Sequence, residues 1–190
     1  MSHVYEEVEV MMHPEELQEI LQALKDIPEN STILEYGSGG STSIFANHLG
    51  PKQNFSSVEH DRPWFDKVAE RVKEHPNAAR ITYIFANLAF HKGLYRFARP
   101  EEEMAAGLEN YVWCPERNPD GWDWSKVNLV LVDGIGRGAC LAALRTVLNP
   151  GTTVFLHDYT GRENWYDWAV KLYTRVKQTN LLLELRVPNK

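Results

Sequence analysis

The amino-acid sequence predicts one α/β domain built on a doubly wound, mostly parallel sheet with helices on both faces. First, short apolar segments alternate with stretches of helical periodicity along the chain. Second, residues 127–132 (VNLVLV) form a nearly continuous apolar run, as a central parallel strand that is buried on both faces requires. Third, turns rich in glycine and proline separate the segments. The length of 190 residues suits a single domain over 1–190.

The predicted elements alternate from the first helix to the last strand. The N-terminal segment, residues 1–30, contains a helix that starts at Pro14 and ends before Pro28, because leucine and isoleucine recur at the spacing of one helix face. Strands are expected at residues 32–36, 55–59, 81–85, 127–132, 152–156 and 181–187, and further helices at 41–49, from Pro63, at 137–148 and at 165–171. Right-handed crossovers between such strands give a Rossmann-like sheet, whose ligands bind at the carboxyl ends of the strands.

Residues 90–124 interrupt this alternation. The segment contains three prolines, an acidic run at 101–103 and three of the six tryptophans, Trp113, Trp122 and Trp124. Long irregular segments of compact domains are usually functional or disordered, and aromatic richness argues against disorder. We interpret the segment as a lid-like insert over the site; the alternative is a structural excursion that packs its own tryptophans.

Composition and charge exclude several classes of partner. The formal net charge of −6 leaves no general basic excess for a nucleic-acid backbone or an anionic membrane surface. No apolar run approaches the roughly 18 residues of a membrane-spanning helix. The acidic N-terminus lacks the order of a signal peptide, so we expect a cytoplasmic protein. Cys114 and Cys140 lack CxxC spacing, and we expect free thiols.

A glycine-rich turn follows the first predicted strand. Residues 35–42 read EYGSGGST, in which glycines allow positive φ and a close approach of the backbone to a ligand. The helix after the turn offers unpaired N–H groups and the positive end of its dipole. Glu59 ends the second strand, about 20 residues further on, where an acidic side chain accepts hydrogen bonds from ribose hydroxyls. The combination predicts a cofactor that contains adenosine.

Two classes of adenosine cofactor compete for this turn. A dinucleotide needs the G-x-G-x-x-G spacing for its pyrophosphate, and Thr42 stands at the third glycine position. A carboxylate at Glu35 would also repel a pyrophosphate, whereas it would help to bind the cationic amino-acid end of S-adenosylmethionine, directly or through water. We therefore favour the methyl donor and keep an NAD-dependent oxidoreductase as the alternative.

Four motifs occur in the order of a known family. They are ILEYGSGGST at 33–42, SVEHD at 57–61, LVLVDG at 129–134 and VFLHDY at 154–159. With them the chain resembles the class I S-adenosylmethionine-dependent methyltransferases, and it looks most like a branch of small-molecule O-methyltransferases with sugar- and glycan-modifying members. The resemblance implies S-adenosylmethionine as cofactor and a hydroxyl of a small acceptor, a sugar or glycan, as the methyl acceptor.

The resemblance also implies a set of cofactor-binding residues. Glu35, Gly37, Ser38, Gly39, Ser41 and Thr42 would hold the methionine end of the cofactor, Glu59 would hold the ribose, and His60, Asp61 and Asn87 would lie at the adenine.

Three side chains at neighbouring strand ends are the candidates for catalysis: Asp133 after the fourth strand, and His157 and Asp158 after the fifth. In one mechanism, Asp133 and Asp158 bind a divalent cation such as Mg²⁺, which lowers the pKa of the acceptor hydroxyl, as in family members with acidic residues at these strand ends. In the other, His157 acts as general base, oriented by a carboxylate, without a metal. Arg137 and Arg162 follow these acids and would orient them or contact the acceptor.

Other roles remain open for several of these residues. Asp133 could cap the helix that follows it, and His157 could be a satisfied interior residue. The tryptophans of the insert, Trp113 among them, and Tyr111 and Tyr159 are candidates for stacking on a sugar or aromatic acceptor. A binding module for the methyl donor without chemistry is a further alternative, and an N-methyltransferase is disfavoured because an Asn/Asp-Pro-Pro-Tyr motif is absent. The sequence leaves the oligomeric state open.

Overall fold

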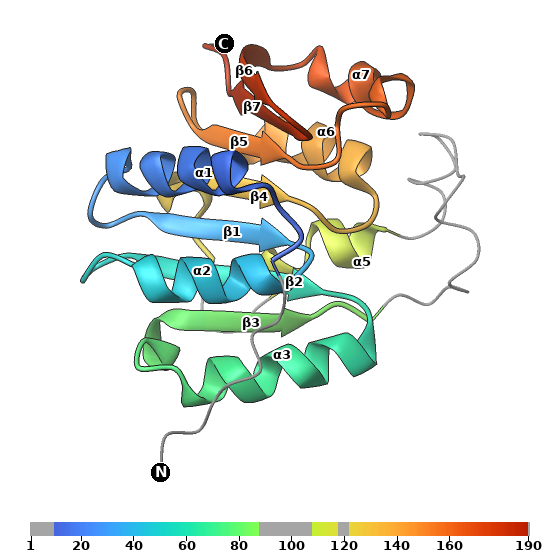
Figure 1. The fold of residues 1–190 in the computed structure, drawn as a ribbon. Coiled ribbons are helices and arrows are strands. Elements are labelled where there is room, and N and C mark those ends of the chain that lie inside the picture. Colours follow the sequence, from blue (N-terminus) through green and yellow to red (C-terminus); the bar gives the residue numbers. More distant parts are fainter. Residues whose placement is uncertain (1–9, 88–107, 118–121, 190) are drawn as a thin grey trace.

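A computed structural model of the chain describes residues 10–87, 108–117 and 122–189. In this part of the chain, seven strands form one sheet in the order β3-β2-β1-β4-β5-β7-β6 (Figure 1). The parallel strands are β1 Thr32–Tyr36, β2 Asn54–Glu59, β3 Ile81–Phe85, β4 Val127–Val132 and β5 Thr153–Leu156; β7 Leu182–Arg186 runs antiparallel to β5, and β6 Thr174–Thr179 runs antiparallel to β7. The prediction of a mostly parallel, Rossmann-like α/β sheet is confirmed.

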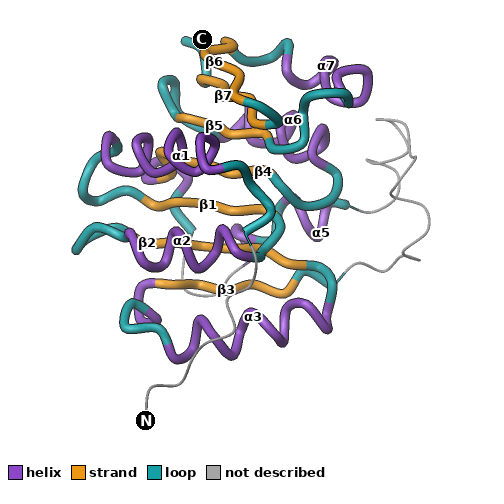
Figure 2. The backbone as a smooth tube through the Cα atoms, viewed as in Figure 1, coloured by secondary structure: helices purple, strands orange, loops and turns teal. Residues whose placement is uncertain are grey.

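Helices cover both faces of the sheet (Figures 1 and 2). One face carries α1 Pro14–Asp26, α2 Gly40–His48 and α3 Arg62–Glu74; the other carries the short α5 Glu109–Val112 and α6 Arg137–Val147, and α7 Glu163–Val170 packs against α6. Three short 3₁₀ turns complete the described elements, at Ala78–Arg80, Pro115–Arg117 and Trp124–Lys126. No helix among the described residues is long and apolar enough to span a bilayer.

The period-two alternation of the strands divides the core into two clusters. On β1, Ile33 packs in one cluster with Ile20 and Leu24 of α1, whereas Leu34 packs in the other with Leu141 of α6. All five side chains are at most 2% exposed. Because both faces of the central strands are covered, β4 is apolar at every position except Asn128, which is the pattern that marked it in the sequence.

The described part of the 90–124 insert belongs to the core. Leu108 and Tyr111 are fully buried, and the rings of Trp113 and Trp122 each contact Trp124 edge to face, with centroid distances of 6.4 and 5.2 Å. This packing matches the structural alternative for these residues. The lid interpretation concerns residues 88–107 and 118–121 as well, and these lie outside the described residues.

The sequence predicted every long element but missed one strand. Predicted and observed boundaries agree within two residues for the strands, and the helix expected at 165–171 begins two residues earlier, at Glu163. Strand β6 (TRVKQT) was not predicted. It lies at the edge of the sheet with nearly all of its residues exposed, so it carries no apolar alternation that would mark it.

Candidate functional site

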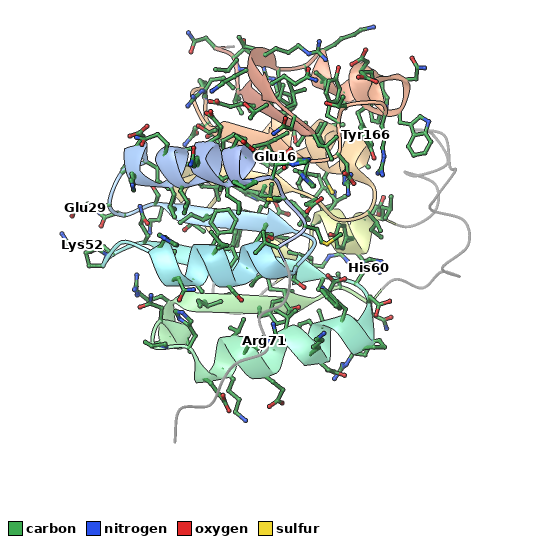
Figure 3. All side chains as sticks on the ribbon, in the orientation of Figure 1. Glu16, Glu29, Lys52, His60, Arg71 and Tyr166 are labelled. Atoms are coloured by element: carbon green, nitrogen blue, oxygen red, sulfur yellow. The ribbon has the colours of Figure 1, made fainter. Side chains whose placement is uncertain are left out.

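A cavity of about 790 Å³ lies at the carboxyl ends of β1, β2 and β4. This is the size and the place of a small-molecule site in an open parallel sheet. Its wall is formed by the loops after these strands, by the first turns of α3 and by residues 10–12 before α1, which cross the strand ends (Figure 2). Figure 3 shows His60 at this edge of the sheet, whereas Glu29 and Lys52 lie at the opposite edge.

The glycine-rich turn is held in place by close backbone contacts. Gly37 has a φ of +91°, and its N–H donates to the carbonyl of Val58 at 2.9 Å. A Cβ atom on Gly37 would lie 2.5 Å from the Cα atom of Gly134, so a side chain has no room there. The N–H of Asp133 donates to the carbonyl of Tyr36 at 2.8 Å. The carboxyl ends of β1, β2 and β4 are therefore joined by backbone contacts, and the residues that follow them line the cavity.

Glu35 supports this turn from beneath. Its buried carboxylate accepts hydrogen bonds from the hydroxyls of Ser41 (2.5 Å), Thr42 (2.6 Å) and Ser57 (2.5 Å). Thr42 Oγ1 in turn accepts the N–H of Gly39 at 2.9 Å. Burial raises the pKa of Glu35 to about 7, against the opposing effect of the three hydroxyls. Glu35 does not line the cavity, and its hydrogen bonds hold the glycine-rich turn from below.

Glu59 lines the cavity as a strongly hydrogen-bonded carboxylate. Oε2 accepts the N–H and the hydroxyl of Ser38, at 3.1 and 3.0 Å. Oε1 accepts the N–H groups of His60 and Asp61, at 2.6 and 2.8 Å, and lies 2.9 Å from His60 Nδ1. Burial favours the neutral form, but the hydrogen bonds from His60 and Asp61 outweigh it and hold the pKa of Glu59 below its ordinary value. The wall of the cavity thus carries an ionised carboxylate that can accept hydrogen bonds.

The start of α3 forms the other side of the cavity. Asp61 caps the helix by accepting the N–H of Trp64 at 3.2 Å, and Trp64 Nε1 donates to the carbonyl of Ser38 at 2.7 Å. The ammonium of Lys67 lies 5.1 Å from the centre of the Trp64 ring. Sequence reasoning missed Trp64 and Lys67, although their place in the first turns of a helix beside Glu59 was a usable signal. Asn87 is exposed and does not line the cavity.

Asp133 is the one of the three predicted catalytic residues that lines the cavity. Its Oδ1 accepts hydrogen bonds from Arg137 Nη2 at 3.1 Å and His157 Nδ1 at 2.9 Å. The N-cap of α6 is Gly136, so Asp133 does not cap that helix. Asp158 has a φ of +56°, and its Oδ2 lies 3.1 Å from both Arg137 Nη1 and Arg162 Nη1. Burial opposes ionisation of Asp158, but Arg137 holds its pKa below the ordinary value.

His157 lies behind this wall, between two carboxylates. The residue is 4% exposed, and its Nε2 is 3.4 Å from Oε2 of Glu16, which is completely buried. Burial disfavours the imidazolium, but the hydrogen bond and the charge of Asp133, with Asp158 and Glu16, raise the pKa of His157. Both ring nitrogens are therefore engaged within the protein.

Glu16 joins the first helix to this cluster and was not predicted as a site residue. Its Oε1 accepts the N–H of Leu181 at 2.7 Å, and its Oε2 accepts the N–H of His13 at 2.8 Å. Glu16 precedes Ile20 and Leu24 by four and eight residues and lies on the same buried stripe of α1. A carboxylate on the apolar stripe of a helix was the sequence signal for a buried partner.

The predicted acceptor-binding residues are placed differently from one another. Tyr159 is 2% exposed, and its hydroxyl donates to Asp167 at 2.7 Å, so its ring is not open to a ligand. Trp113 packs on Trp124 and does not line the cavity. Arg162 is the exposed member of the set, with 43% of its side chain accessible.

Tyr111, which the sequence offered as a stacking residue, lies in the core beside the loop after β4. Its buried hydroxyl has no hydrogen-bond partner among the described residues, and a Cβ atom on Gly134 would lie 2.0 Å from it. Its ring meets His60 edge to face at 5.8 Å. Burial raises the pKa of Tyr111 well above its ordinary value, so the hydroxyl stays protonated.

Comparison with solved structures defines the fold. No protein-family model and no curated protein matches the chain. A methyltransferase-like protein from Silicibacter pomeroyi is 22% identical with a TM-score of 0.76, and the match covers 95% of this chain and 89% of that chain. An S-adenosylmethionine-dependent O-methyltransferase from Thermotoga maritima is 11% identical with a TM-score of 0.62 (96% and 68% covered). An RNA methyltransferase from Salinibacter ruber, solved with S-adenosyl-L-homocysteine, is 18% identical with a TM-score of 0.54 (95% of each chain). The chain therefore has the α/β fold that these methyltransferases share.

Proposed function

We propose that this chain is an S-adenosylmethionine-dependent methyltransferase that transfers a methyl group to a hydroxyl of a small acceptor, in the class of sugars and glycans. The observation that carries the proposal is the position of Glu59: an ionised carboxylate at the end of β2, beside the glycine-rich turn, on the wall of a cavity large enough for the cofactor. Its Oε2 is bonded by the hydroxyl of Ser38, and a ribose hydroxyl would take the place of that donor.

The charge of the cavity favours a cationic ligand. Among the described residues that line it, Glu59, Asp61 and Asp133 supply three carboxylates, whereas Lys67 is the only lysine or arginine. The excess of negative charge suits the sulfonium and ammonium groups of S-adenosylmethionine and opposes the pyrophosphate of NAD. We therefore place the methyl donor above the dinucleotide.

We assign the reactive contact with the acceptor to Asp133. When bound, the cofactor would supply a methyl group on a positively charged sulfur. Arg137 and His157 both bond to Oδ1 of Asp133, so its Oδ2 is the atom that we propose receives the acceptor hydroxyl. Asp133 would take the proton of the acceptor hydroxyl, whose oxygen would accept the methyl group that the bound cofactor supplies. His157, with both nitrogens bonded to carboxylates, positions Asp133 instead of acting as the base.

The sugar or glycan class of the acceptor comes from the resemblance of the sequence motifs. The net charge of −6 supports a small acceptor over a nucleic acid, although the fold is also used by the RNA methyltransferase from Salinibacter ruber. An acceptor screen with neutral and acidic sugars, and with RNA as comparison, tests this part of the proposal.

Calorimetric titration with S-adenosylhomocysteine tests the cofactor. We expect the protein to bind this compound and not NAD. Glu59→Gln is expected to weaken binding by at least about tenfold, because one hydrogen bond to a charged group contributes about 1.5–3 kcal/mol. The matched control is Glu29→Gln, which removes an exposed carboxylate paired with Lys52 at the opposite edge of the sheet. Preference for NAD, or equal affinities of the two variants, would sink the proposal.

Methyl transfer itself is tested with Asp133→Asn. We expect this variant to bind S-adenosylhomocysteine as the wild type does and to lose most of its turnover with any acceptor that the screen finds, since removal of a positioned base typically costs 10²–10⁴-fold in rate. Cofactor binding without turnover of any acceptor would instead support a binding module that lacks chemistry.

A further inference from the structure

Three potential metal ligands converge at the ends of β4 and β5. One ligand atom from each of Asp133, His157 and Asp158 can be chosen so that all three lie within 4.8 Å of one another. Two carboxylates and an imidazole at this spacing are a common donor set for a divalent cation. Spacing alone therefore leaves a metal-dependent reaction open, and the contacts of the neighbouring side chains decide whether an ion fits.

Arg137 fills the space between the two carboxylates. Its Nη2 donates to Oδ1 and to the backbone carbonyl of Asp133, at 3.1 and 2.9 Å. Its Nη1 donates to Oδ2 of Asp158 and to the carbonyl of His157, both at 3.1 Å, and its Nε donates to the carbonyl of Gly134 at 2.9 Å. These five bonds use the five N–H donors of a guanidinium. Arg137 is 9% exposed, so it keeps no N–H for an acceptor and is built into the strand ends.

His157 is already in contact with carboxylates on both sides of its ring. Its Nδ1 lies 2.9 Å from Oδ1 of Asp133 and its Nε2 lies 3.4 Å from Oε2 of Glu16. An ion between the three side chains would have to break the Nδ1 contact, and both aspartates already bind arginine.

Arginine side chains already face the carboxylates of the cluster. The guanidinium of Arg137 contacts Asp133 and Asp158, and that of Arg162 contacts Asp158 as well. A divalent cation between Asp133 and Asp158 would meet the Arg137 guanidinium at close range and would be repelled, because the surroundings are largely buried.

We propose that the guanidinium of Arg137 is the resident cation of the Asp133–Asp158 pair, standing where a divalent metal would otherwise bind, so that the site works without a metal ion. Arg137 draws the ends of β4 and β5 together and fixes the rotamer of Asp133, which faces the cavity. It is a positioning residue, because its donors all end on this protein. The inference concerns the cation site alone and stands whether or not the proposed methyl transfer is correct.

Removal of the guanidinium should turn the cluster into a metal site. We expect the wild-type protein to bind no stoichiometric Mn²⁺ in an electron paramagnetic resonance titration. Arg137→Ala is expected to bind about one equivalent, at least about tenfold more tightly than the wild type, and the double variant Arg137→Ala/Asp158→Asn to lose it again. Arg62→Ala is the matched control, since it removes an exposed arginine paired with Asp66 on α3 and should leave the protein without Mn²⁺ binding.

Thermal unfolding with and without Mn²⁺ keeps the test decisive if Arg137→Ala is unstable. We expect Mn²⁺ to raise the Tm of Arg137→Ala and to leave the Tm of the wild type unchanged, because a ligand stabilises only the fold that binds it. Stoichiometric Mn²⁺ binding by the wild type that Asp158→Asn abolishes would overturn the proposal. The proposal would also be overturned if Arg137→Ala bound Mn²⁺ no more tightly than the wild type and Mn²⁺ did not raise the Tm of the variant. Neither measurement involves the cofactor or an acceptor, so the outcome is separate from that of the proposed function.

Discussion

Gly37 and Gly134 meet backbone to backbone at the centre of the candidate site. A Cβ atom on Gly37 would lie 2.5 Å from both the N and the Cα atom of Gly134, and the φ of +91° at Gly37 would strain any side chain. This contact joins the loop after β1, which carries the glycine-rich turn, to the loop after β4, which carries Asp133. These two glycines therefore set the distance between the glycine-rich turn and Asp133.

Gly37→Ala is predicted to cost more stability than a glycine substitution at a similar φ in open space. Gly151 has a φ of +86° with no atom within 4 Å of an added Cβ, so Gly151→Ala carries the backbone strain alone, about 1–2 kcal/mol. Gly37→Ala carries the same strain and the backbone clash, and we expect it to lose at least about 2 kcal/mol more. Urea unfolding of both variants measures the difference, and equal losses would contradict the contact.

The stability of the protein is predicted to fall with rising pH because of Glu35. Its pKa in the folded state is about 7, above the ordinary value of 4.5, so the folded state binds the proton more tightly than the unfolded state. The contribution is then complete below about pH 4.5 and is lost as the pH rises through 7. The difference of pKa corresponds to roughly 3 kcal/mol. Glu35→Gln should flatten this part of the curve in urea unfolding between pH 4.5 and 8; a parallel curve would refute the assignment.

Tyr36 and Tyr111 form a matched pair of buried tyrosines. Their ring centres lie 5.4 Å apart, but the hydroxyl of Tyr36 donates to the carbonyl of Val112 at 2.6 Å, whereas that of Tyr111 has no partner in the part of the chain that the structure describes. Tyr36→Phe is predicted to lose about 0.5–1.5 kcal/mol, and Tyr111→Phe to be neutral or stabilising, because a buried hydroxyl without a partner costs free energy. Calorimetric melting of both variants checks the contrast; a larger loss for Tyr111→Phe would show that its hydroxyl has a partner.

Glu16→Gln is predicted to lower the pKa of His157 and to destabilise the fold. The His157 pKa is raised in the folded state, so its pairing stabilises the protein below about pH 6.5 and is lost as the pH rises through the folded pKa. Removal of the buried carboxylate should cost roughly 3 kcal/mol near pH 6, and imidazole nitrogen chemical shifts report the pKa. Glu19→Gln on the same helix breaks only a half-exposed pair with Lys177 and should cost less than about 1 kcal/mol. Equal effects of the two variants would argue against a buried pair.

Most of the fold could be predicted from the sequence because helices and strands are marked by local patterns. Neighbouring residues identify the apolar strand at 127–132 and the helix starts at Pro14 and Pro63. Glu59 and Asp133 could be placed at the cavity because strand ends in a parallel sheet share one edge. Strand β6 was not predicted because an exposed edge strand needs no apolar side.

The partners of the site residues could not be predicted from the sequence. Arg137 donates all of its N–H groups to residues just after β4 and β5, and Tyr159 bonds to Asp167. These contacts depend on rotamers and packing that no local sequence pattern encodes. The same holds for Glu35, which the motif places at the cofactor and the structure places beneath the loop. Residue type and position thus identified the neighbourhood, and only the three-dimensional contacts separated supporting from ligand-facing side chains.

The hydrogen bond from Leu181 N–H to Glu16 also bears on how the molecule folds. The two residues are 165 positions apart in the sequence, and the buried carboxylate of Glu16 cannot be satisfied until the chain around Leu181 has arrived. Contacts of such long range form late, because the entropy of closing the intervening loop must be overcome first. On a ribosome, α1 could therefore pack on β1 early, but Glu16 would gain its contact with Leu181 only after the turn between β6 and β7 has emerged.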